Sequence, residues 1–92
     1  MSPFAVKCER PQVKICGLTR ADEAAGCAAA GADAVGCVFF PKSPRCVTTE
    51  QAAEIRRAVT PKAALVGVFV DAAAAEILHV RDRAGIDAAQ LH

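Results

Sequence analysis

The sequence predicts an α/β fold built on a parallel sheet, with the element order βαβαβαβ. Two continuous apolar runs, residues 34–40 and 64–70, alternate with alanine-rich stretches of helical periodicity. Strands that are apolar along their whole length are typical of a parallel sheet covered on both faces. Right-handed helical crossovers then connect consecutive strands. The periodicity alone allows either a small open sheet or part of a closed barrel.

The first strand and helix are expected over residues 13–16 and about 19–30. Thr19, followed three residues later by Asp22, has the spacing of a helix capping box, so we expect the helix to begin there. Gly31 then supplies a left-handed stop at the other end of the helix.

The second strand is expected over residues 34–40. Residues 41–45 follow it as a loop, because two prolines in this segment exclude both a helix and a β-ladder. Thr48 and Gln51 repeat the capping-box spacing and predict the start of the second helix, which Pro61 closes.

The third strand is expected over residues 64–70, and Asp71 is expected to cap the third helix. The apolar stripe of this helix consists of Ile77, Val80 and Ala84. Gly85 stops the helix, and residues 86–92 begin a fourth strand.

The composition argues against a nucleic acid or a membrane as partner. The formal net charge is +1, aromatic residues make up 4% of the chain, and no apolar run approaches the length of a membrane span. The cysteines are odd in number and widely spaced, without a C-x-x-C pair, which favours a reducing cytoplasm over a disulfide framework or a zinc site. They are Cys8, Cys16, Cys27, Cys37 and Cys46.

Residues 1–11 are expected to form a short irregular arm. They contain two prolines and several charged residues, and they lack the apolar core of a secretory signal. Residues 12–92 are expected to form the domain itself.

Five motifs in order resemble the phosphoribosylanthranilate isomerase family. The octapeptide at residues 13–20 is similar to that family's first strand and loop, and the other four motifs follow in the family's sequence. They are Gly31 to Gly36, Phe39 followed by Ser43 to Val47, Val66 to Val70, and Gln90 to His92. Each motif alone is weak, but five in order are specific.

The resemblance implies a (βα)8 TIM barrel, of which this chain would be roughly the first half, truncated at the fourth strand. It also implies an isomerase of tryptophan biosynthesis. That enzyme converts the aminoaldose N-(5-phosphoribosyl)anthranilate to 1-(2-carboxyphenylamino)-1-deoxyribulose 5-phosphate by an Amadori rearrangement. The family uses no metal or organic cofactor.

Carried over by motif, Cys16 is the general base that removes the proton from carbon 2 of the sugar. Arg45 binds the anthranilate part of the substrate, and His92 is an active-site histidine. The family's aspartate acid and phosphate-binding loops lie beyond His92. Strand alternation places Lys14 on the same face as Cys16, where its ammonium group would favour the thiolate. The alternative is that Lys14 pairs with a carboxylate at the floor of the barrel.

We expect the isolated chain to be inactive without the acid and the phosphate site. We also expect it to be unstable, or to self-associate through the open face of its sheet. Two other interpretations stay open. One is a fragment of another sugar-phosphate (βα)8 enzyme, and the other is a non-catalytic α/β interaction module.

Overall fold

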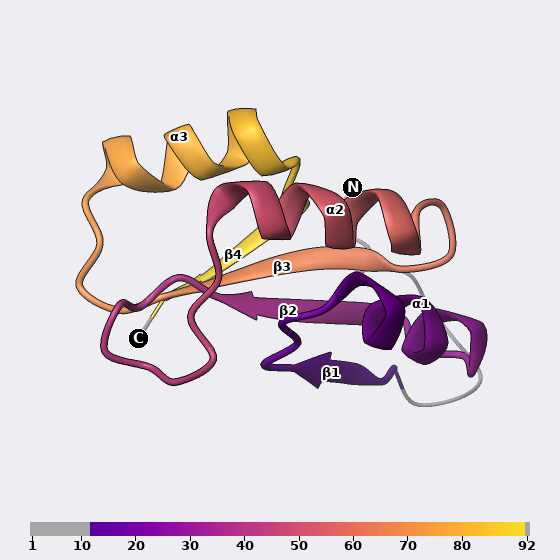
Figure 1. Cartoon of the computed structure of the whole chain (residues 1–92). Helices are drawn as coiled ribbons and strands as arrows, with labels where there is room; N and C mark the ends of the chain where they lie inside the picture. Colours follow the sequence, from indigo (N-terminus) through magenta and orange to yellow (C-terminus); the bar gives the residue numbers. More distant parts are fainter. Residues whose placement is uncertain (1–11, 92) are drawn as a thin grey trace.

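The structure is a computed structural model that describes residues 12–91, so the expected arm over residues 1–11 lies outside the described residues. Within these residues, four strands and three helices alternate in the order βαβαβαβ, as the sequence predicts (Figure 1). The strands form one parallel sheet in the order β1-β2-β3-β4. No helix in this part of the chain has the length and apolar character needed to cross a membrane.

All seven expected elements are present, and the strands are shorter than expected at one or both ends. The strands are β1 (Lys14–Cys16), β2 (Ala34–Val38), β3 (Ala64–Phe69) and β4 (Ala88–Leu91). The helices are α1 (Ala21–Ala29), α2 (Thr49–Val59) and α3 (Ala74–Ala84).

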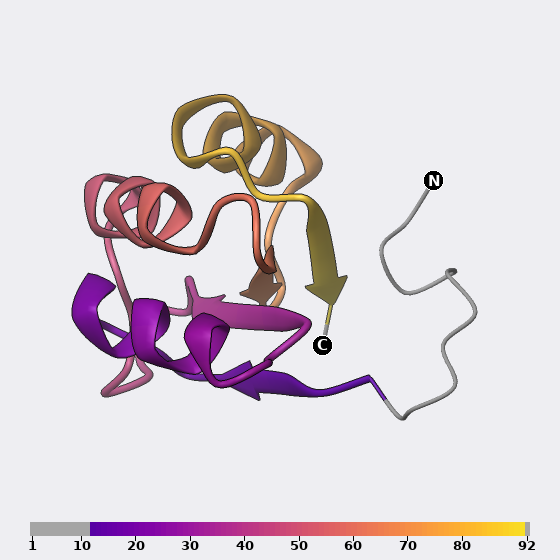
Figure 2. The ribbon, with the colours of Figure 1, turned by 90° about the vertical axis from the view of Figure 1, so that its right-hand side faces the viewer.

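The strand order distinguishes the two closures that the periodicity allows. In a doubly wound open sheet the strand order reverses and helices cover both faces. Here the strands follow one another in chain order, and the three helices lie on one face of a curved sheet (Figures 1 and 2). A sheet that grows in one direction with all its helices outside is the arrangement of a (βα)8 barrel. The opposite face, which none of the helices of residues 12–91 covers, corresponds to the inside of such a barrel.

The hydrophobic core fills the space between the sheet and the helices. Alternate residues of β2 and β3 point toward the helices and have essentially no exposed surface, and α2 supplies the largest helical contribution. The Phe39 and Phe69 rings stack at the carboxyl end of this layer, with their centroids 5.2 Å apart. The largest fully buried side chains are Phe69, Ile55, Leu65, Val35, Val59 and Cys37.

The predicted N-cap of α2 is confirmed. The Gln51 backbone N–H donates to Thr48 Oγ1 at 3.1 Å, and the Thr48 backbone N–H donates to the Gln51 side chain at 2.8 Å. The predicted glycine stops are confirmed as well, since Gly31 and Gly85 have φ angles of +107° and +76°.

The predicted capping box at Thr19 is wrong. The N-cap of α1 is Arg20, which makes no side-chain cap hydrogen bond. Its guanidinium instead binds the Asp22 carboxylate at 2.6 Å. This hydrogen bond lowers the pKa of Asp22.

The predicted cap at Asp71 is also wrong. The N-cap of α3 is Ala73, again without a side-chain hydrogen bond. Asp71 lies two residues earlier with a φ angle of +51°, so the chain turns there before the helix begins.

Two aspartates tie the amino ends of the strands together. Asp33 precedes β2, and its carboxylate accepts the Val13 backbone N–H at 2.7 Å. Asp87 precedes β4, and its carboxylate accepts the Leu65 backbone N–H at 2.8 Å. Each aspartate lies two residues after the glycine that ends a helix, so the α1–β2 and α3–β4 junctions are both held to the segment of the preceding strand.

Candidate active site

The carboxyl edge of the sheet brings two of the predicted site residues to one place. In parallel α/β folds, functional side chains gather where the strands end. Cys16 is the last residue of β1, and Arg45 lies in the loop between β2 and α2. This loop is held against the sheet because the Val47 backbone N–H donates to the Val38 carbonyl at 2.9 Å.

The Cys16 thiol lies over Gly36 on the face of the sheet opposite the helices. Cys16 pairs with Gly36 in the β1–β2 register. A methyl group placed on Gly36 would lie only 2.9 Å from Cys16 Sγ, so the sulfur occupies the space that a side chain would need there. The neighbours Val35 and Cys37 are fully buried on the helix side. The thiol is therefore presented on the open face, and Cys16 is exposed.

Arg45 crosses the backbone immediately after Cys16. A methyl group on Gly17 would lie 2.9 Å from Arg45 Cδ and 3.1 Å from Nη1. Gly17 itself has a φ angle of +82°, a left-handed conformation that favours glycine. The structure thus brings the Arg45 guanidinium next to the segment that carries the thiol. Arg45 is exposed, so its donors face solvent, where a ligand carboxylate could bind in a bidentate manner.

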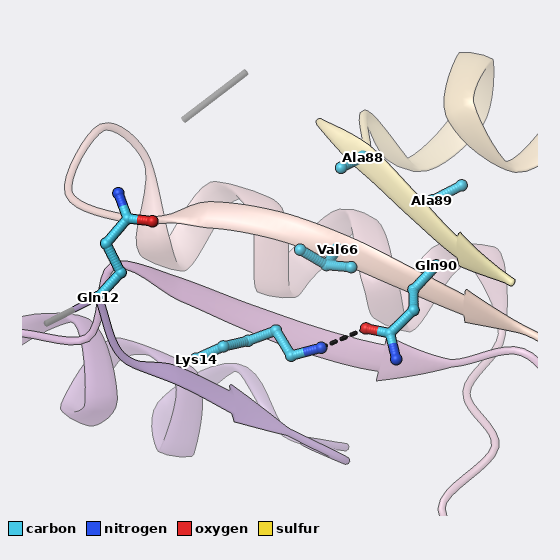
Figure 3. A pocket seen from close by; sticks show the side chains of 6 residues that line it. All are labelled: Gln12, Lys14, Val66, Ala88, Ala89 and Gln90. Carbon is cyan, nitrogen blue, oxygen red and sulfur yellow. Dashed lines mark hydrogen bonds between the residues drawn. The ribbon is translucent and has the colours of Figure 1, made fainter. Parts of the chain in front are cut away.

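Lys14 lies on the same face, toward the amino end of the sheet. Its Nζ donates to Gln90 Oε1 on β4, across the open side of β2 and β3 (Figure 3). Among the described residues this partner is an amide, whereas the alternative interpretation of Lys14 paired it with a carboxylate. These two residues line a cavity of about 480 Å³ together with Gln12, Val66, Ala88 and Ala89. The influence of Lys14 on Cys16 stays a hypothesis.

The four described cysteines differ sharply in accessibility. Cys37 is fully buried, and this desolvation raises the pKa of its thiol to about 12. Cys27 and Cys46 are half-buried, and Cys16 is exposed. Within residues 12–91, Cys16 is therefore the thiol most available for chemistry with a ligand.

The remaining candidates for site groups are the two histidines and any cluster of metal-binding side chains. His92 lies outside the described residues, and His79 is exposed on α3. No group of three or more His, Cys, Asp and Glu side chains between residues 12 and 91 could hold a metal ion. The parts played by Gly17 and Gly36 were not predicted from the sequence. A glycine inside a strand often marks a close approach of other atoms, and Gly36 carried that signal.

Comparisons with known proteins agree with this arrangement. The family model for N-(5'phosphoribosyl)anthranilate (PRA) isomerase matches residues 13–92. An N-(5'-phosphoribosyl)anthranilate isomerase of Alcanivorax borkumensis is 50% identical over 82 residues, which are 89% of this chain and 38% of that protein.

Solved structures give the same result. The crystal structure of phosphoribosyl anthranilate isomerase from Thermotoga maritima matches with a TM-score of 0.86 and 42% identity, over 90% of this chain and 40% of that one. A phosphoribosyl anthranilate isomerase in complex with reduced 1-(o-carboxyphenylamino)-1-deoxyribulose 5-phosphate also matches with a TM-score of 0.86 and 42% identity. That match covers 90% of this chain and 43% of the other.

The chain spans about two fifths of the length of these relatives. The similarity runs through nearly all of the described residues and includes the strand that carries Cys16 and the loop that carries Arg45. The strand order and the family match lead to one conclusion: the chain belongs to the N-(5'-phosphoribosyl)anthranilate isomerase family.

Proposed function

We propose that these residues serve an isomerase that converts N-(5-phosphoribosyl)anthranilate to 1-(2-carboxyphenylamino)-1-deoxyribulose 5-phosphate in tryptophan biosynthesis. The observation that carries the proposal is the exposed Cys16 thiol at the carboxyl end of β1, beside the Arg45 guanidinium, in a chain of this family. The related structure with a reduced form of the product supports the same substrate class.

In the proposed mechanism Cys16 acts as the general base. Opening of the ribose ring, with a proton added to the ring oxygen, gives a protonated imine between carbon 1 and the anthranilate nitrogen. The Cys16 thiolate then takes the proton from carbon 2, and the electrons of that C–H bond form the enolamine. Protonation at carbon 1 and loss of the hydroxyl proton at carbon 2 give the aminoketose, so no atom is gained or lost. A positioned base of this kind contributes about 10²–10⁴-fold to the rate.

Arg45 is proposed to bind the anthranilate carboxylate. Its guanidinium offers parallel N–H donors that match the two carboxylate oxygens. Because Arg45 lies against Gly17, which directly follows Cys16, a substrate held by Arg45 is held close to the base. His92 is proposed as a further substrate-binding residue. The acid that protonates the ribose ring oxygen is proposed to be an aspartate on a later strand.

The isolated 92-residue chain is proposed to be a partial barrel domain over residues 12–92 with negligible turnover. Loss of remote binding contacts and of the acid lowers the rate of the chemical step as well as the affinity. Among the described strands, β1 and β4 are the outer ones, and each has one edge that pairs with no other strand. Unpaired edges favour pairing with a second chain, so we propose that the isolated chain self-associates through the open side of its sheet and these edges. A stable monomer in size-exclusion chromatography with light scattering would contradict this.

The proposed location is the cytoplasm, where a reducing environment suits the free thiols of the described residues.

Activity can be tested by joining this chain to the carboxy-terminal part of the Thermotoga maritima isomerase and following the loss of substrate fluorescence. We expect turnover in this completed protein. Cys16→Ser should lower kcat at least 100-fold, because serine is a far weaker base than a thiolate. Cys27→Ser is the matched control, since Cys27 lies on α1 away from the open face, and it should retain turnover. Full activity in Cys16→Ser would refute the assignment of the base.

A further inference from the structure

Neither backbone conformation nor packing in the hydrophobic core explains why residue 36 is a glycine. It is an interior residue of β2, and the glycines with positive φ are Gly17, Gly31 and Gly85. Any residue could therefore adopt the backbone of Gly36, and glycine weakens a strand relative to residues with a side chain. The reason for glycine at this position must be space.

That space is occupied by Cys16. A methyl group on Gly36 would lie 2.9 Å from Cys16 Sγ, 3.3 Å from its Cα and 3.4 Å from its Cβ. The first distance is shorter than real contacts of this kind, and the second involves backbone that cannot rotate away. Gly67, which pairs with Cys37 in the β2–β3 register, differs in its contacts. A methyl group there would meet Phe69, Ile86 and Phe39 on the core side, so Gly67 serves packing alone.

The carbonyl of Gly36 holds the segment that follows Cys16. The backbone N–H groups of Gly17 and Leu18 both donate to the Gly36 carbonyl, each at 3.1 Å. One residue of β2 thus leaves room for the thiol and also fixes the turn directly after it. Among the described strands, the three-residue strand β1 pairs with β2 alone.

We propose that Gly36 is a positioning residue for the Cys16 thiol: its missing side chain sets the place of the sulfur, and its carbonyl fixes the chain that follows. The inference rests on the proposed function only where it assigns this position a part in catalysis. A side chain at residue 36 would displace the thiol from the floor of the site, and a misplacement of about 1 Å can cost about 100-fold in rate.

The test compares Gly36→Ala with Gly26→Ala in the 92-residue chain, at a concentration where it elutes as a monomer. Gly26 is the matched control, because a methyl group there meets nothing within 4 Å. Alkylation of Cys16 by iodoacetamide is measured by mass spectrometry relative to Cys46 in the same molecule. Gly36→Ala should change this ratio at least threefold, while Gly26→Ala should not. A smaller change in Gly36→Ala would overturn the proposal.

Unfolding is monitored in the same samples. Cys37 is fully buried, so it should be alkylated only when the chain opens. If Gly36→Ala exposes Cys37, the substitution is repeated in a Cys16→Ala background and the thermal midpoints are compared. Removal of the sulfur should relieve most of the loss in midpoint. An equal loss in both backgrounds would overturn the proposal.

Turnover of the completed protein separates this inference from the proposed function. Gly36→Ala should lower kcat about 100-fold with little change in KM, and Gly26→Ala should retain both. If Cys16→Ser retained activity while the alkylation ratio still responded to Gly36→Ala, the assignment of Cys16 as the base would fail and the positioning of the thiol would stand. If Cys16→Ser lost activity and the ratio did not respond, the reverse would hold.

Discussion

Replacement of Asp87 by alanine removes one carboxylate that connects three elements. Asp87 Oδ2 accepts the Leu65 backbone N–H at the start of β3, at 2.8 Å. The same oxygen accepts Arg56 Nη1 of α2, at 2.5 Å. The substitution breaks both contacts and leaves the part-buried Leu65 N–H without that acceptor.

The expected cost follows from the two contacts. A hydrogen bond to a charged group contributes about 1.5–3 kcal/mol. The ion pair with Arg56 adds only about 0–1 kcal/mol, because its two side chains remain 31% and 29% exposed. We therefore expect Asp87→Ala to lower the free energy of unfolding by about 2–3 kcal/mol. Asp87→Asn keeps an oxygen acceptor for Leu65 and loses the charge, so its cost should be intermediate.

Urea unfolding followed by circular dichroism measures these costs. All variants are compared at one protein concentration, because the midpoint of a self-associating chain depends on concentration. Asp82→Ala is the matched control. Its carboxylate pairs with Arg81 on the surface of α3 and is 67% exposed, so its removal should change stability by less than about 0.5 kcal/mol. Equal midpoints for Asp87→Ala and Asp82→Ala would refute the argument that the junction aspartate supports the fold.

Two other predictions concern the core and a helix end. The raised pKa of Cys37, about 12 against an ordinary value of 9.0, means that the native state keeps a proton that the unfolded state releases. The stability from this thiol should be complete below about pH 9 and fall by up to about 1.4 kcal/mol per pH unit toward pH 12. In urea unfolding at several pH values, Cys37→Ala should show a shallower alkaline loss than the wild type, and equal slopes would contradict this. Thr48→Ala should cost about 1 kcal/mol by removing the cap of α2, whereas Thr49→Ala should cost clearly less in the same assay.

The sequence predicted helix ends correctly where the structure of that end depends on one short segment alone. The cap at Thr48 and the glycine stops at Gly31 and Gly85 depend on a few neighbouring residues, and the structure contains all three. The N-caps expected at Thr19 and Asp71 do not form, because other local interactions are present there. The Arg20 guanidinium binds the Asp22 carboxylate, and the chain turns at Asp71 before α3 begins.

Strand order and the open face could not be derived from periodicity, because both depend on contacts between distant segments. The same limit applies to the site. The resemblance named Cys16 and Arg45, and the structure shows that they approach the same turn. The two glycines beneath them were not singled out, because the residues that need the space lie far away in the sequence.

The amino edge of this sheet contributes to stability, and the carboxyl edge contains the candidate site. At the amino edge, Asp33 and Asp87 bind backbone N–H groups of the preceding strands and contribute stability. At the carboxyl edge, Gly17 and Gly36 have no side chains, and this leaves space for Arg45 and the Cys16 thiol to lie against the backbone. This separation agrees with barrels in which one face supports the fold and the other the chemistry. Asp87→Ala should therefore lower the urea midpoint without changing the alkylation of Cys16 relative to Cys46 in the folded chain. A change in that ratio would mean that the edges are coupled through the length of the strands.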